Sequence, residues 1–483
     1  MSIPKLQTGI VAFDLISEGG LPMGRTTLLA GSSGSAKTLF AAQFLAMGIL
    51  KFNQNGVFVT FEEQVEDIRN DLKGFGWDID LWESEGKWTF IDASPKEEDV
   101  ITIGEFDLSA FRIRLERAIA KNNAQRVVID SIGSIFTHFP EHNIIRQEMS
   151  KVTMTLRRVK ATALITTERT EEYGAISRYG VEEFLADNVM ILRNVLTNER
   201  RRRTIEILKF RGSNHVKGES PFTIVPMQAV VIVPISAMKL TQQASGQRVS
   251  SGVRELDQMC GGGFFKGSIV LVSGATGAGK TLLASNFING AKESQERCLL
   301  LAFEESREQI FRNAKGWGQD LGQLEADGLL KVVSTYPEVC SLEDHLINIQ
   351  ELVKEFKPDR IALDSISALT RNPSEKGFQE FVVALTNFLK HDGVTTMLTA
   401  TTHMLTGGAS ITEGDIATIT DTIILLRYVE LTGEMQRSIT VLKMRGSRHD
   451  ASIRQILIDE EGMQIGRPIT GISGLLSNTP IVA

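Results

Sequence analysis

The 483-residue sequence is poor in residues that build covalent or metal crosslinks. It has three cysteines, Cys260, Cys298 and Cys340, and seven histidines, without CxxC or His-rich spacing. Such a set predicts neither a disulfide framework nor a zinc site, and it suits a reducing compartment. No run reaches 18 apolar residues, so we expect no membrane-spanning helix. The N-terminal residues do not resemble a signal peptide, and the expected location is therefore cytoplasmic.

An excess of positive charge is also lacking. The formal net charge is −7 and the pI is about 5.7, which argues against a protein that coats nucleic acid. The one dense basic run, residues 200–203, fits a solvated hairpin tip as well as a local basic patch. Hydrophobic residues, by contrast, make up 42% of the chain, enough for sizeable cores in two or three domains.

The chain contains one long internal repeat. Residues 9–38, GIVAFDLISEGGLPMGRTTLLAGSSGSAKT, recur at residues 252–281 as GVRELDQMCGGGFFKGSIVLVSGATGAGKT, an offset of 243. Further motifs recur at offsets of 242 and then 234, as expected for one scaffold with small loop deletions. We therefore predict two duplicated domains, residues 1–241 and 249–483, joined by the polar linker 242–248, QQASGQR.

Each copy alternates strand and helix patterns, which predicts an α/β fold. Short apolar runs, typical of buried parallel strands, occur at residues 27–30, 57–61, 127–130, 163–167 and 269–272. Residues 108–121 have helical periodicity. Residues 191–209 alternate instead, and predict an antiparallel hairpin at the sheet edge, turning at Asn198 and Glu199, with a counterpart turn at Thr432 and Gly433. The expected architecture is two tandem RecA-like P-loop domains, each a mainly parallel sheet with helices on both faces.

The second copy contains a full phosphate-binding motif, G-x-x-x-x-G-K-[ST]. In this motif successive backbone N–H groups surround phosphate oxygens, the lysine reaches the terminal phosphates and the threonine hydroxyl ligates Mg²⁺. The predicted ATP-binding residues are Gly274, Ala275, Thr276, Gly277, Ala278, Gly279, Lys280 and Thr281.

The first copy departs from this motif at one position, where Ala36 replaces the last glycine. We expect helical φ there, just before a helix begins, so that alanine is tolerated. The predicted ATP-binding residues of this copy are Gly31, Ser32, Ser33, Gly34, Ser35, Ala36, Lys37 and Thr38.

Acidic residues follow predicted strands at matched positions of the two copies. Asp130 and Asp364 each end an apolar run, where a carboxylate holds the magnesium shell; Thr38, Asp130, Thr281 and Asp364 are thus the candidate metal ligands. The pairs Glu62–Glu63 and Glu304–Glu305 end the next strands. One acid of each pair is a candidate base for the attacking water or hydroxyl, its pKa raised by its neighbour. A charged helix start is the alternative.

Cations recur near the end of the second hairpin strand. Lys209 and Arg211 match Lys443 and Arg445, two residues apart and on one strand face. They are candidates for fingers inserted into a neighbouring subunit's site, with surface ion pairs as the alternative. Trp77 and Trp317 follow amphipathic helices, where packing is expected first and an adenine contact second.

Together these residues resemble the KaiC family, the cyanobacterial circadian-clock ATPase and autokinase with its bacterial relatives. The resemblance covers residues 9–474 and rests on strings such as FVTFEE, TTERTEEYGAISRYGVEEF, DNVMILRNV, ITDTIILL and KMRGSRHD. It implies a homohexamer of two stacked rings, with a slow ATPase in the N-terminal ring and a Ser/Thr autokinase in the C-terminal ring. It also implies that Lys209, Arg211, Lys443 and Arg445 act in the neighbour's sites and that Trp317 lines the adenine.

Two departures from the family pattern concern phosphorylation and partners. The adjacent Ser and Thr acceptors fall on Ala417 and Thr418, so an ordered two-site cycle is not expected; Thr418 is the principal candidate and Thr412 the minor one. The first copy has no hydroxyl at either acceptor position. The chain stops at Ala483, before the family's KaiA-docking tail, whereas residues 101–110, ITIGEFDLSA, resemble the region tied to KaiB-type partners. A KaiB-like partner is therefore expected rather than a KaiA-like one.

Three alternatives stay open at this point. An ATPase-only relative would lack the kinase step, with Thr418 an ordinary structural threonine. A RecA-type DNA motor would need basic pore loops, yet residues 401–415, TTHMLTGGASITEGD, contain no Lys or Arg. A scaffold that binds ATP only to assemble would not need the acid pairs, and both pairs are present.

Overall fold

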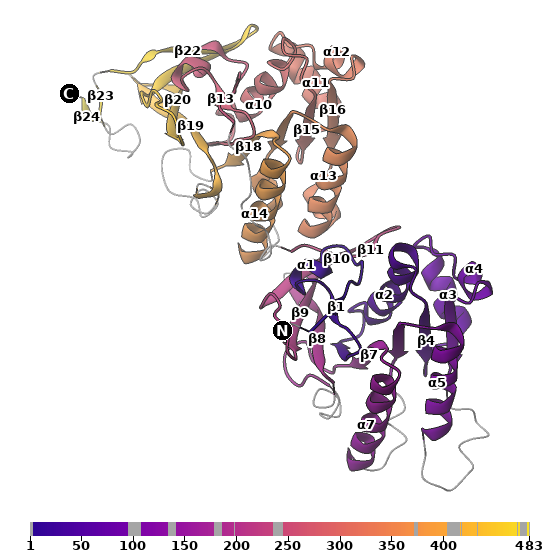
Figure 1. Cartoon of the computed structure of the whole chain (residues 1–483). Helices are drawn as coiled ribbons and strands as arrows, with labels where there is room; N and C mark the ends of the chain where they lie inside the picture. The colour runs from indigo at the N-terminus through magenta and orange to yellow at the C-terminus, as the bar shows by residue number, and fades with distance from the viewer. Residues whose placement is uncertain are drawn as a thin grey trace. The chain divides into compact units, whose positions relative to one another are not determined.

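The computed structural model describes most of the chain, and all structural statements below refer to these residues. They are residues 3–94, 108–133, 142–177, 186–197, 199–234, 245–370, 375–402, 416, 418–431, 433–470, 472–473 and 481–482. The chain divides into two compact units, Met1–Met238 and Lys239–Ala483 (Figure 1). The proposed linker lies partly in residues 235–244, outside the described residues, so the exact boundary stays a prediction.

The first unit is built on a nine-stranded sheet in the order β11-β10-β9-β8-β3-β7-β6-β4-β5. Strands β8, β3, β7, β6, β4 and β5 run parallel, and β9, β10 and β11 add antiparallel pairs. The strands of this sheet are β3 (Thr26–Gly31), β4 (Gly56–Thr60), β5 (Trp88–Asp92), β6 (Arg126–Asp130), β7 (Thr162–Glu168), β8 (Asn188–Thr197), β9 (Arg200–Phe210), β10 (Glu219–Val225) and β11 (Ala229–Ile232). The parallel strands expected from apolar runs are confirmed.

Helices cover both faces of this sheet because alternate strand residues face opposite ways. Leu29 and Phe58 pack in one hydrophobic cluster with α2 and α3, while Leu28 and Val57 pack in another with α5 and α7. The helices are α1 (Phe13–Ile16), α2 (Lys37–Phe52), α3 (Val65–Lys73), α4 (Ile79–Ser84), α5 (Ser109–Asn122) and α7 (His142–Arg158), and the remaining strands are β1 (Lys5–Leu6) and β2 (Leu21–Pro22). The helix predicted over residues 108–121 is confirmed as α5.

The second unit repeats the plan with the sheet order β16-β15-β17-β18-β14-β19-β20-β21-β22. Its strands are β12 (Arg248–Val249), β13 (Phe264–Phe265), β14 (Ile269–Gly274), β15 (Cys298–Ala302), β16 (Leu330–Ser334), β17 (Arg360–Asp364), β18 (Thr395–Thr401), β19 (Thr422–Leu431), β20 (Glu434–Met444), β21 (Arg454–Asp459), β22 (Gly462–Pro468), β23 (Ile472–Ser473) and β24 (Ile481–Val482). Its helices are α9 (Arg254–Met259), α10 (Lys280–Asn289), α11 (Arg307–Gly316), α12 (Leu321–Ala326), η3 (Pro337–Val339), α13 (Leu342–Phe356), η4 (Ile366–Thr370) and α14 (Glu375–His391).

The predicted hairpins are present, but the prediction that they lie at the edge of the sheet was wrong. Strands β8 and β9 pair antiparallel up to Thr197 and Arg200, and β19 and β20 pair up to Leu431 and Glu434. In neither unit do they form the sheet edge, because two more antiparallel strands continue each sheet beyond the hairpin. The sequences of those additional strands show no alternating pattern strong enough to have predicted them. No helix among the described residues is long and apolar enough to cross a bilayer.

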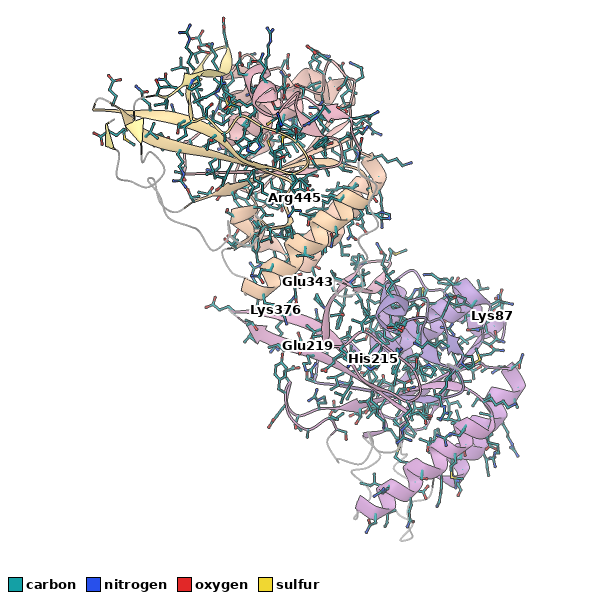
Figure 2. The ribbon with its side chains drawn as sticks, turned by 60° about the vertical axis from the view of Figure 1, so that its left-hand side comes forward. Lys87, His215, Glu219, Glu343, Lys376 and Arg445 are labelled. Atoms are coloured by element: carbon teal, nitrogen blue, oxygen red, sulfur yellow. The ribbon has the colours of Figure 1, made fainter. Side chains whose placement is uncertain are left out.

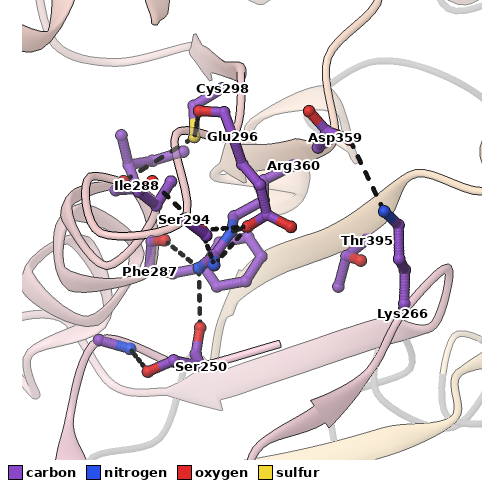
Figure 3. A network of polar contacts seen from close by, with 12 residues as sticks. Ser250, Lys266, Phe287, Ile288, Ser294, Glu296, Cys298, Asp359, Arg360 and Thr395 are labelled. Carbon is purple, nitrogen blue, oxygen red and sulfur yellow. Dashed lines mark hydrogen bonds and ion pairs between the residues drawn. The ribbon is translucent and has the colours of Figure 1, made fainter. Parts of the chain in front are cut away.

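A buried arginine begins the strand that ends at Asp130 in the first unit and at Asp364 in the second. Arg360, only 2% exposed, donates from Nη1 to the carbonyls of Ser250 at 2.8 Å and Phe287 at 3.0 Å (Figure 3). Its Nε donates to Glu296 at 2.6 Å. The guanidinium therefore ties β17 to α10 and to the segment that opens the unit.

The first unit makes the same connection with a neutral partner. Arg126 donates to the carbonyls of Thr8 at 3.1 Å and Phe44 at 2.7 Å, and to the amide oxygen of Gln54 at 2.8 Å. Gln54 stands where the second unit has Glu296. Burial lowers the pKa of Arg126 to about 10, so the group stays charged at neutral pH.

Replacing Arg360 by Met should destabilise the second unit by about 3 kcal/mol, because the Glu296 carboxylate and two carbonyls lose their buried partner. Hydrogen exchange at residues 361–364 measures the loss. The matched control is Lys266→Met, whose half-exposed partner Asp359 lies 3.8 Å away (Figure 3); exposed pairs contribute at most about 1 kcal/mol. Equal effects of the two substitutions would contradict a special role for the buried guanidinium.

Candidate active sites

The phosphate-binding loops lie where the strands end. In each unit the loop connects a central parallel strand to a buried helix, β3 to α2 and β14 to α10. Strand pairing places Thr60 beside Asp130, and Ala302 beside Asp364. The carboxyl ends of parallel strands meet at one edge of a sheet, where open α/β folds bind ligands. The loop, the aspartate and the acid pair of each copy therefore converge there.

The expectation for Ala36 was wrong. Ala36 adopts φ 71° and ψ 32° at the N-cap of α2, in the left-handed region rather than the helical one. Gly279, its counterpart, has φ 105°. The loop imposes this conformation on the residue before the lysine, and a side chain there costs about 1–2 kcal/mol. Alanine is accommodated with strain.

The loop lysines point back over their own loops. Lys37 Nζ donates to the carbonyls of Gly31 and Ser32 at 2.9 Å each, and Lys280 Nζ donates to Gly274 at 2.8 Å and Ala275 at 2.9 Å. Burial lowers the pKa of Lys280, and the carboxylates of Asp364 and Glu304 oppose that shift. An ammonium with two of its three donors used on the loop still has one for a phosphate oxygen.

The aspartates lie where the metal ligands were predicted. Asp130 ends β6 and accepts hydrogen bonds from Thr166 and Thr38, and Asp364 ends β17 and accepts one from Thr399. Burial raises the pKa of Asp130. A carboxylate beside a threonine hydroxyl at the start of the loop helix is an oxygen-only set that suits Mg²⁺. Thr38 with Asp130, and Thr281 with Asp364, therefore fit the ion.

Each acid pair faces the same hollow as the loop lysine. Glu62 and Glu63 line a cavity of about 390 Å³ with Lys37, Thr38 and Asp130. In the second unit, a cavity of about 450 Å³ is lined by the corresponding residues Glu304, Glu305, Lys280, Thr281 and Asp364.

The second acid of each pair has a raised pKa, but not chiefly for the predicted reason. Burial is the largest cause for Glu63 and Glu305, followed by the strand-end aspartates Asp130 and Asp364. The adjacent glutamate contributes less.

The aromatic wall of each cavity comes from one matched position. Trp317 lines the second cavity, and its contact with the adenine stays a prediction. Trp77 does not line the first: it is 4% exposed and packs in the core. Phe75 lines the first cavity instead. Aligning the two Gly-x-Gly segments, residues 74–76 and 316–318, would have identified Phe75 from the sequence.

The sequence did not predict several side chains that contact the phosphate-binding loops. Arg203 Nε donates to the carbonyl of Gly34 at 3.3 Å, and Arg437 Nε donates to Gly277 at 3.0 Å. These arginines share the offset of 234, so the basic run contains a repeated loop contact rather than only a solvated tip. In the first unit Glu172 also accepts a hydrogen bond from the Ser32 hydroxyl at 2.5 Å.

Three of the four repeated cations contact carbonyls of their own chain that do not line these cavities. Lys209 Nζ donates to the carbonyl of Ala186 at 3.1 Å, and Lys443 Nζ donates to that of Thr420 at 2.9 Å. Arg445 (Figure 2) donates to the carbonyl of Thr418 at 2.6 Å. Arg211 follows β9 and is exposed. In the described part of the chain, none of the four lines the cavity of its own unit.

Three predictions fall largely on residues outside the described part of the chain. Thr412 and Ala417 are not described, and Thr418 is. The segment compared with DNA-motor loops, residues 401–415, is described only at residues 401–402. The segment resembling a KaiB-contact region, residues 101–110, is described only from residue 108.

The strain at Ala36 can be relieved. We expect Ala36→Gly to stabilise the first unit by about 1 kcal/mol, since glycine adopts left-handed φ freely. Gly279→Ala should destabilise the second unit, because its Cβ would also lie 3.2 Å from Met463 Cε. Thermal unfolding followed by tryptophan fluorescence reports mainly on the first unit, which contains three of the four tryptophans, Trp77, Trp82 and Trp88. Hydrogen exchange in α10 reports on the second unit. A lower midpoint for Ala36→Gly would contradict the assignment of strain.

Comparisons with known proteins agree with this geometry. A family model described as "ATPase: KaiC" matches residues 6–237 and again residues 249–469. The chain is 56% identical over 480 residues to circadian clock protein KaiC3 of Synechocystis sp., covering 99% of this chain and 95% of that protein. It is 51% identical over 479 residues to circadian clock oscillator protein KaiC of Synechococcus elongatus, with 99% and 92% covered. The two matched halves and the two loop-and-acid sites lead to one conclusion: the chain belongs to the KaiC family of ATPases.

Proposed function

We propose that both cavities hydrolyse Mg-ATP and that the second also transfers phosphate to a threonine of a neighbouring subunit. The observation that carries the proposal is the presence, in each cavity, of a loop lysine, a strand-end aspartate and an acid pair. These are the groups that phosphoryl transfer requires for positioning and for balancing charge.

In hydrolysis, a water oxygen attacks the γ-phosphorus while the bond to the β–γ bridging oxygen breaks and ADP leaves. One glutamate of the pair accepts the water proton. The loop N–H groups stabilise the negative charge of the phosphates, together with Lys37 in the first site or Lys280 in the second. Phe75 in the first site and Trp317 in the second form a wall for the adenine ring. Thr38 and Asp130, or Thr281 and Asp364, would hold Mg²⁺, which would supply positive charge beside the phosphates.

The repeated cations support sites shared between subunits. Lys209, Arg211, Lys443 and Arg445 contact or flank the loops before β8 and β19, away from their own cavities. A finger acts in trans by reaching a neighbour's phosphates. We therefore propose a homohexamer in which these cations complete the adjacent site. A KaiB-like partner on the N-terminal ring is a further proposal, supported by residues 101–110 and by relatives named as circadian clock proteins.

Thr418 is the proposed acceptor. Thr418 is exposed, and its carbonyl oxygen accepts a hydrogen bond from the Arg445 guanidinium. One of the proposed trans cations therefore adjoins the proposed acceptor. In transfer the Thr418 hydroxyl oxygen replaces water, its proton passing to Glu304 or Glu305. Attack requires the oxygen and phosphorus about 3–3.5 Å apart. The proposal places this geometry at the boundary between two subunits.

The double change Glu62→Gln with Glu63→Gln should lower first-site turnover by about 10²-fold or more while ATP still binds. Measuring it in a chain that also carries Lys280→Ala isolates the first site. Glu66→Gln is the control, because Glu66 is exposed, pairs with Arg69 and does not line the cavity. Unchanged turnover in the double variant would assign these acids to structure.

Incubation of the full chain with Mg-ATP should add about 80 Da, the mass of one phosphoryl group, mainly at Thr418. Thr418→Ala should remove most of this label with ATPase activity retained, and the matched Thr412→Ala should retain most of it. Intact-mass spectrometry with phosphopeptide mapping measures both. Label chiefly elsewhere, or none after prolonged incubation, would leave an ATPase without autokinase activity.

A further inference from the structure

The two sites differ at one position beside the acid pair. Eight residues after the second acid, the helix that follows it carries Asp71 in α3 and Asn313 in α11. Both residues line their cavities. They share the 242-residue offset of the acid pairs, so they occupy equivalent places in the duplicated plan. One is an anion and the other a neutral amide.

In the second unit the amide holds the acid. Asn313 Nδ2 donates to Glu305 Oε2 at 3.1 Å. Glu305 is half-buried, so a hydrogen bond from protein replaces part of its hydration and restricts its rotamer. Arg312, on the same helix, also acts on this carboxylate, whereas Glu304 and Asp364 repel it. Glu305 is thus restrained by one donor and attracted by one cation.

In the first unit the residue at this position repels the acid instead of donating a hydrogen bond to it. An ionised Asp71 has no proton to donate, and it repels Glu63. Asp130 from β6, Asp67 from α3 and the adjacent Glu62 repel Glu63 as well. The charged groups that act most strongly on Glu63 are therefore carboxylates, and Glu63 is more exposed than Glu305.

We propose that Asn313 is a positioning residue that fixes Glu305 for phosphoryl transfer, and that Asp71 denies Glu63 the same restraint. The side chain at this one position then sets part of the difference in turnover between the two sites. The inference rests on the proposed role of the acid pairs.

The test exchanges the two side chains in the full chain with Mg-ATP. The second site is isolated by Lys37→Ala, and the first by Lys280→Ala. Asn313→Asp should lower second-site kcat about tenfold, the scale of a misplaced reacting group, with KM for ATP changed less than about twofold. Asn313→Ala, which removes the donor without adding charge, should give a smaller fall. Asp71→Asn should raise first-site kcat several-fold.

Charge-matched controls separate positioning from field effects. Lys315→Gln makes α11 one unit more negative, as Asn313→Asp does, and Glu66→Gln removes one negative charge from α3, as Asp71→Asn does. Both residues are exposed and lie outside the cavity linings. If these controls change kcat as much as the exchanges do, net charge rather than positioning explains the effect, and the proposal is refuted. A raised KM with unchanged kcat would overturn it in favour of a direct nucleotide contact.

One further variant separates this inference from the function on which it rests. Glu305→Gln, in the chain that isolates the second site, should lower kcat. If it does not, the inference about Asn313 fails, and only an unchanged kcat in the double variant Glu304→Gln with Glu305→Gln would refute the proposed role of the acid pair. If Glu305→Gln lowers kcat while Asn313→Asp leaves it unchanged, the acid pair keeps its role and only the inference about Asn313 is refuted.

Discussion

Parallel strand pairing is the constraint on which each site depends. Because β3, β7, β6 and β4 run the same way, their carboxyl ends meet at one edge, and Thr60 lies beside Asp130 in register. The same register in the second unit places Ala302 beside Asp364. Loop, aspartate and acid pair come from segments separated by dozens of residues, and only this pairing gathers them around one cavity.

The two units preserve this arrangement and differ around it. The loop lysine, the loop threonine and the strand-end aspartate are the same in both. The units differ at positions around these residues. Phe75 in the first unit corresponds to Trp317 at the cavity wall of the second, and Gln54 corresponds to Glu296 beside the buried arginine. Such positions alter how firmly a group is held rather than which group is present. A duplicated chain can thus keep one chemistry and operate it under two sets of restraints.

Much of this was readable from the sequence because short motifs carry it. Apolar runs predicted the parallel strands, and the repeated Gly-rich motif located both loops. The failures involve information that is not local. Whether the hairpin forms an edge depends on two strands from further along the chain, β10, which pairs with β9, and β11, which pairs with β10. The conformation of Ala36 is imposed by the loop on both sides of it, and the pKa of Glu63 responds more to burial than to its neighbour.

The buried arginine clamp also bears on how each unit is made. Arg126 leaves the ribosome 118 residues after Thr8, whose carbonyl it binds, and Arg360 follows Ser250 by 110 residues. Until the arginine has been synthesised, the opening segment and the P-loop helix lack the group that joins them. Long-range contacts of this kind slow folding, since a large loop must close first. During translation, therefore, the contact that joins the opening segment to α2 or α10 can form only after roughly half of the unit has emerged.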